Sequence, residues 1–286
     1  LNGGANAVSA DVNNINGSVA GSGTTFSVSI DTGNLNVGNV NTTGITSFTN
    51  TDATVGLGNI AQCAGCTISS TDNITETAGL NGSVNVNGAG ITSTGGTITL
   101  NAGTNDGDVT VSAGAPVSGS GAVAFNTGTN GSIVLGANVS STASTLTLTG
   151  GSAVGESVTV NTGVTATGNQ GVAVNTPTLN LNGTAAITAT NNNVDVQSND
   201  AANALTVSMG NGSSLNATGA GGDVTFNNTT AGAITINNAG LGTINANDQV
   251  ILNGGANAVS VDVNNINGCV AGSGTTFSVS IDTGNL

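Results

Sequence analysis

The stretch "VTVSAGAPVSGSGAVAFNTGTNGSIVL", Val109 to Leu135, contains the pattern that decides the fold. Its segments 109–111, 123–125 and 133–135 each carry two large apolar residues separated by one residue. A two-residue period places such apolar side chains on the same face of a β-strand. The Gly, Asn and Ser residues between the segments turn the chain at little cost. The stretch therefore predicts short strands joined by turns.

The same pattern continues along the whole chain, and Asn-Gly pairs separate many of its segments. No stretch has the 3.6-residue period of a helix, so we predict an all-β protein. Further segments of this kind lie at 26–30, 84–86, 98–100, 146–148, 158–160, 172–174, 179–181, 194–196, 205–207, 224–226 and 234–236.

The spacing of the segments predicts how the strands are arranged. Val84, Val109, Ile133 and Val158 follow one another at a nearly constant interval. That interval falls within the period of roughly 20–30 residues typical of solenoids, in which each coil stacks on the one before it. We predict a parallel β-helix (β-solenoid) of stacked coils of roughly 20–26 residues, with aliphatic stacks inside and Thr and Asn ladders outside.

A long internal repeat indicates how the chain is organised. Residues 1–35 recur as 252–286, with Val261 in place of Ala10 and Cys269 in place of Ser18. We therefore predict that 1–251 is one repeat block of about 11 coils and that 252–286 begins a second, near-identical block. The blocks are either tandem in one giant polypeptide or end coils that let separate subunits stack head to tail. The near-identity favours the first alternative.

The composition excludes several classes of function. The chain has no Lys, Arg or His and 14 Asp or Glu, which gives a formal net charge of −14. No side-chain salt bridge is possible, and no cationic surface exists that could bind nucleic acid. No apolar run reaches the roughly 18 residues of a spanning helix, so we predict no membrane span. A hydrophobic fraction of 37% argues against disorder.

Residues 101–161, with the phrases "GGTITLNAG" (95–103) and "GDVTF" (222–226), resemble the filamentous haemagglutinin and autotransporter-type β-helical surface proteins. The resemblance implies secretion across an outer membrane and an extracellular or cell-surface location. It also implies a long exported stalk that serves adhesion or forms a fibre. Many adhesins of this kind use basic residues freely, and their absence here favours a purely structural role. We expect any signal peptide to have been removed or to lie outside this segment.

The three cysteines are the first candidates for chemistry. Cys63 and Cys66 have C-x-x-C spacing, which favours a small local disulfide, or two thiols, at a turn of the solenoid. Zinc would need two further ligands, and redox activity would need a helix N-terminus or a nearby cation. Cys269, the third cysteine, has no partner in the C-x-x-C pair. It either forms a cross-link to another chain or is a Ser/Cys variation in a buried slot for a small residue.

The acidic residues are the second candidates. Asp106 and Asp108 offer oxygen ligands to calcium, but they lack the spacing of an EF-hand loop, which favours a solvated turn. Carboxylate pairs can hydrolyse glycosides, and the pairs to consider are Asp106 with Asp108, or Asp195 with a neighbour on the next coil. No aromatic platform accompanies them. We predict no catalytic or cofactor-binding residue and no enzyme activity.

These observations together predict a structural repeat segment of a long extracellular fibre, sheath or surface stalk. Such a segment would associate with itself, head to tail or as a continuous filament. One alternative is an adhesin binding module, for which Thr46–Asn81 is the only stretch irregular enough. The other alternative is an ice- or surface-binding solenoid that uses flat Thr ladders.

Overall fold

The structure is a computed structural model that describes residues 1–200, 203–228, 232–237 and 242–282. These residues form β-strands and turns and no helix, as the sequence predicts. The chain divides into two compact units, Leu1–Ala143 and Ser144–Leu286.

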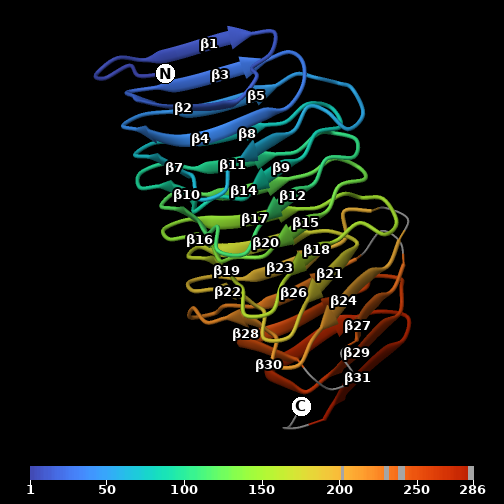
Figure 1. The fold of residues 1–286 in the computed structure, drawn as a ribbon. Coiled ribbons are helices and arrows are strands. Elements are labelled where there is room, and N and C mark those ends of the chain that lie inside the picture. The colour runs from blue at the N-terminus through green and yellow to red at the C-terminus, as the bar shows by residue number, and fades with distance from the viewer. Residues whose placement is uncertain (201–202, 229–231, 238–241, 283–286) are drawn as a thin grey trace. The chain divides into compact units, whose positions relative to one another are not determined.

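The strands of the first unit are short and follow one another closely (Figure 1). In chain order they are β1 (Val8–Val12), β2 (Ser18–Gly23), β3 (Phe26–Ile30), β4 (Leu35–Thr42), β5 (Thr46–Asn50), β6 (Ile60–Gln62), β7 (Thr67–Ser70), β8 (Ile74–Thr77), β9 (Val84–Val86), β10 (Gly90–Ser93), β11 (Ile98–Asn101), β12 (Val109–Val111), β13 (Val117–Gly119), β14 (Val123–Asn126), β15 (Ile133–Leu135) and β16 (Val139–Ser141).

Most coils of the first unit have three faces, and each face is a ladder of parallel strands. The first face contains β6, β9, β12 and β15, the second contains β7, β10, β13 and β16, and the third contains β8, β11 and β14. Val84 lies opposite Val109, which lies opposite Ile133. The interval seen in the sequence is therefore the register of the coils, and the parallel β-helix is confirmed.

The hydrophobic core is the inside of these coils. Alternate residues of most strands are buried, as in β12, where Val109 and Val111 are inside and Thr110 is partly exposed. The side chains on one face stack directly on those of the neighbouring coils, because the strands are parallel and in register. Each Å² of apolar surface buried in the core stabilises the fold by about 25 cal/mol, and this stabilisation is distributed along the whole unit.

The coils at the start of the first unit are shorter than the sequence predicts. β4 is one bent strand that pairs with both β6 and β7 and so covers two faces without a turn between them. The coil from Val8 to Phe26, which lies opposite it, contains β2, and β2 pairs with both parts of β4 and so covers the same two faces. This coil falls below the predicted minimum of roughly 20 residues. A coil that lacks one corner needs less chain to return to the same face.

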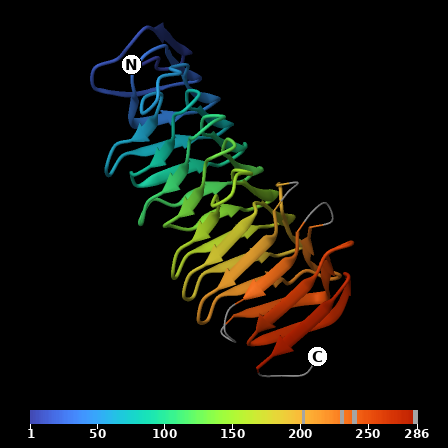
Figure 2. The same cartoon turned by 90° about the vertical axis from the view of Figure 1, so that its right-hand side faces the viewer.

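The strands of the second unit form the same kind of stack, and Figure 2 shows its coils one below another. In chain order they are β17 (Thr145–Thr149), β18 (Val158–Val160), β19 (Thr165–Gly168), β20 (Gly171–Asn175), β21 (Thr178–Leu181), β22 (Ala186–Ala189), β23 (Val194–Gln197), β24 (Leu205–Met209), β25 (Ser214–Ala217), β26 (Val224–Asn227), β27 (Ile234–Asn237), β28 (Thr243–Asn253), β29 (Val259–Val263), β30 (Asn265–Ser273) and β31 (Phe277–Ile281).

Coil length varies in the second unit as well. Leu205 lies opposite Ile234, so the coil between them exceeds the predicted maximum of roughly 26 residues. Long turns add residues outside the stack without disturbing the strand register. At the end of this unit β28 pairs with both β25 and β26, so it is again a long strand that covers two faces. β30 then pairs along most of β28.

Polar side chains on the outer surface of the first unit form ladders of hydrogen bonds. We call Asn34, Asn59, Ser83, Asp108 and Ser132 the cap ladder, since each residue directly precedes a strand that lies on the first face or leads into it. The side chains of the first four accept hydrogen bonds from the backbone N–H of the following member, over 3.1, 2.7, 3.1 and 2.7 Å. The ladder thus links successive coils in addition to the strand pairing.

Candidate functional site

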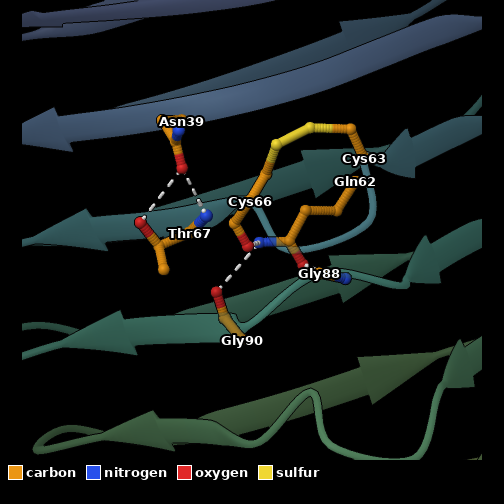
Figure 3. Close-up of a disulfide and its surroundings, with 7 residues drawn as sticks. All are labelled: Asn39, Gln62, Cys63, Cys66, Thr67, Gly88 and Gly90. Carbon is orange, nitrogen blue, oxygen red and sulfur yellow. Dashed lines mark hydrogen bonds between the residues drawn. A yellow bond between two sulfur atoms is a disulfide. The ribbon is translucent and has the colours of Figure 1, made fainter.

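The most unusual local structure is the disulfide turn, residues Gln62–Thr67, between β6 and β7. Cys63 and Cys66 are joined by a disulfide, with their Cα atoms 5.4 Å apart (Figure 3). Gly65 between them has a φ of +72°, a conformation that glycine adopts without strain. The C-x-x-C pair is thus a local disulfide at a turn of the solenoid, and in this state the two sulfurs are not available as thiolate ligands.

A buried amide side chain holds the disulfide turn in place. Gln62 Nε2 donates hydrogen bonds to the carbonyl oxygens of Cys66 (2.8 Å) and Gly90 (2.9 Å), and its Oε1 accepts one from the N–H of Gly88 (Figure 3). Asn39, on the preceding coil, accepts a hydrogen bond from the N–H of Thr67 (2.9 Å). The turn is therefore fixed to the coils on both sides.

Gly88 allows the next coil to approach this turn closely. A Cβ atom at this position would lie 2.2 Å from the Cys66 carbonyl oxygen and 2.6 Å from Cδ of Gln62. These distances are far inside van der Waals contact, so only glycine fits. The sequence alone marked Gly88 as a turn residue and gave no sign of this contact.

Glu76 is a buried carboxylic acid inside the first unit, and it was not among the residues expected to form a site. Its coil neighbours on the third face are Phe48 and Leu100. Burial raises the pKa of Glu76 from 4.5 to about 8, and its Oε1 atom has no hydrogen-bond partner. The alternation Ile74-Thr-Glu76 does place Glu76 on the inner face, and this was the available signal.

Asp52 lies in a turn of the same unit, and its surroundings favour the ionised carboxylate, in contrast to those of Glu76. Its carboxylate accepts hydrogen bonds from the N–H groups of Thr54 (2.8 Å) and Gly33 (2.6 Å). The bonds from Thr54 and Gly33 lower the pKa of Asp52, because they stabilise the ionised form. Asp52 therefore fastens the turn that leads from β5 to β6.

Asp106 and Asp108 accept hydrogen bonds from two different residues of the next coil. Asp106 accepts a hydrogen bond from Nδ2 of Asn130 (2.7 Å), whereas Asp108 accepts one from the backbone N–H of Ser132 (2.7 Å) within the cap ladder. Within the described residues no group of three or more Cys, Asp or Glu side chains could hold a metal ion. The geometry matches a turn whose carboxylates bind the next coil.

Asp195, in β23, borders a polar hollow of about 280 Å³ on the second unit. Thr147, Gln170 and Asn193 also line this hollow, and Gly171 and Ala173 leave it open because they are small. Partial burial raises the pKa of Asp195, a hydrogen bond from Thr225 opposes the shift, and the charge of Asp223 adds to it. Its direct neighbours in register are Ala173 and Thr225, so no carboxylate lies opposite it.

Cys269 is an exposed free thiol on β30, opposite Gln249. The prediction of a buried slot is therefore wrong at this position. The residue lies on the outward-facing side of its strand, and its counterpart Ser18 in the first copy is exposed as well. The structure leaves the thiol accessible from solvent.

Comparison with protein-family models, with curated proteins and with solved structures found no match to this chain. What the chain shares with haemagglutinin and autotransporter-type proteins is the parallel β-solenoid fold. No helix in the described residues has the length and apolar character that crossing a bilayer requires.

Proposed function

We propose that this chain is a non-catalytic structural segment of a long extracellular fibre, sheath or surface stalk. The observation that carries the proposal is the parallel register within each unit, where strands such as β11 and β23 pair with strands of the coils before and after them. A solenoid of this kind lengthens by adding coils, each of which contacts only its neighbours. Such an architecture suits a filament.

The polar surface supports the same role. Thr77, Asn101 and Asn126 form a second hydrogen-bonded ladder on the first unit, at 3.3 and 2.9 Å. This second ladder uses neutral amides and a hydroxyl, which can stack at the strand spacing of about 4.8 Å without the repulsion that like charges would suffer. A local disulfide agrees with an oxidising, extracellular location.

Electron microscopy of the native material tests the proposal. We expect continuous filaments whose axial repeat is close to the length of one block, residues 1–251. The recombinant 286-residue chain, imaged in the same way, is the control that shows what a single segment looks like. Native material that consists of isolated monomers would refute the fibre.

An adhesin module is the second candidate, because the predicted irregular stretch Thr46–Asn81 exposes apolar side chains. Val55 is 81% exposed and Leu57 is exposed as well, both in the turn between β5 and β6, and the disulfide turn follows. Replacing Val55 and Leu57 with serine should abolish binding to host cells if this turn holds a ligand. Val154, a similarly exposed valine of the second unit, is the matched control.

A further inference from the structure

We infer that the outer edge of β1 is an interface, and that its partner is the last complete coil of a preceding block equivalent to residues 1–251. The equivalent of β27 would then pair with β1 and the equivalent of β28 with β2, in the register that β27 and β28 adopt against β29 and β30. This inference rests on the proposed function, because it specifies how segments of the fibre join.

The two copies of the repeat fold in the same way, each within its own unit. In the first copy Val8 lies opposite Phe26, and in the second Val259 lies opposite Phe277, with every following pair in matching register. The N–H of Gly3 donates to the carbonyl of Ser22 over 2.8 Å, and the N–H of Gly254 donates to that of Ser273 over 2.9 Å. The repeat thus keeps one local structure in two surroundings.

The surroundings differ on one side, and the second copy shows what belongs there. β29 pairs with β27, so that Ile234 lies opposite Val259 and Ile236 opposite Val261, whereas the described partner of β1 is β3 alone. Val12 is 39% exposed, but its counterpart Val263 is fully buried. The same apolar face is therefore covered in one copy and open in the other.

The seam between blocks lies inside a strand and not in a linker. β28 runs without interruption through Ile251 and Leu252, and its pairing with β26 continues across that bond. Leu252 is fully buried there, whereas Leu1 is 58% exposed. Leu1 and Asn2 therefore have the geometry of the last residues of a strand like β28, since Asn2 already forms a parallel bridge with Ser22.

The open side of the first copy has room for such a coil. An apolar hollow of about 610 Å³ lies there, lined by Leu1, Ala10, Val12, Ile15 and Val19. In the second copy the counterparts of Val12 and Ile15 are buried. A coil carrying the equivalents of Ile234 and Ile236 on its inner face would continue the aliphatic stack and extend the parallel ladder.

Digestion of the native protein with an endoprotease that cleaves before aspartate tests the covalent junction. The second copy gives the peptide DQVILNGGANAVSV, residues 248–261. A preceding block gives the same peptide ending in alanine, because position 10 is Ala. We expect both masses. A first-copy peptide that starts at Leu1, or that follows an unrelated sequence, would overturn the inference.

Hydrogen exchange tests the register. In the native protein the amides of Val8–Val12 should exchange as slowly as those of Val259–Val263, and in the isolated 286-residue chain they should exchange markedly faster. Equal, fast exchange of Val8–Val12 in both samples would contradict the interface. Native filaments without the alanine-ended peptide would refute this inference and leave the proposed fibre standing. Native monomers that contain the peptide would support the junction between blocks and refute the fibre.

Discussion

Glu76 occupies a position in the first unit where both neighbouring coils have an apolar residue. Phe48 and Leu100 are in register with it, and Phe26, one coil further, packs against Phe48 with ring centroids 6.0 Å apart. A carboxyl group there is stable only when it is protonated, because ionisation in an apolar interior is costly. The residue makes the stability of the coil sensitive to pH.

We expect the free energy of unfolding to fall as the pH rises from about 4.5 to about 8. The pKa of Glu76 is raised to about 8 when folded, so its contribution is complete below the unfolded value of 4.5 and is lost as the pH passes through the folded value. Urea denaturation of wild type and Glu76→Gln at both ends of this range measures the effect.

The Gln variant should lose most of this pH dependence, and Glu76→Leu should be more stable than wild type at pH 8 by about 1–3 kcal/mol. The raised pKa of Asp195 gives a slope of the same sign, which remains in both variants as an internal reference. An unchanged slope in Glu76→Gln would show that Glu76 is not the group responsible.

At the scale of single elements, the cap ladder orders the start of each strand that follows one of its members. The Asp108 side chain accepts the hydrogen bond of the Ser132 N–H just before β15 begins. We expect Asp108→Ala to lower the free energy of unfolding by about 1 kcal/mol, whereas Asp108→Asn keeps an acceptor and should cost less.

Asp106→Ala is the matched control for this prediction. Asp106 is also acidic and belongs to the same turn, but its partner is the exposed side chain of Asn130, so its removal should cost under about 0.5 kcal/mol. Equal losses at the two positions in thermal or urea denaturation would contradict a special role for the cap ladder.

The disulfide turn gives a second test at this scale. Gly88→Ala should destabilise the protein by several kcal/mol and expose the turn, because the new methyl group would overlap the Cys66 carbonyl oxygen. Gly65→Ala, in the same turn, meets no atom within 4 Å and has only a positive φ to overcome, at about 1–2 kcal/mol. Hydrogen exchange around β7 and β10 distinguishes the two; similar effects would argue against the close approach.

At the scale of the whole molecule, the charged side chains can only repel one another. The chain has 14 acidic side chains and no basic ones. Added salt therefore screens repulsion between side chains and has no side-chain ion pair to weaken. Folding must be supported by apolar burial and neutral hydrogen bonds.

We expect the melting temperature to rise by a few degrees when salt increases from about 10 mM to about 150 mM, which shortens the Debye length from about 30 to about 8 Å. Sodium chloride and tetramethylammonium chloride should act equally if screening is the cause. A rise with sodium chloride alone would reveal a specific cation site, and a fall with both salts would contradict the charge argument.

The fold was predictable because one rule, alternation within strands, is repeated at a nearly constant spacing. Val84, Val109 and Ile133 stack as that spacing requires. The long strands β4 and β28 were not predictable, since a bend between two faces needs no turn residue. Glu76 was missed for a related reason: its acidic character suggested solvent, whereas its position in the alternation placed it inside.

The stacking also has a mechanical consequence. Strands in these units lie side by side, and their hydrogen bonds join one coil to the next, so a pull on the end of the chain would load the outermost coil first. That coil would peel away before the one beneath it carries much force. A single coil, such as that from Val84 to Val109, would release about 80 Å of extended chain. A filament built this way would yield gradually under tension and absorb work at each step.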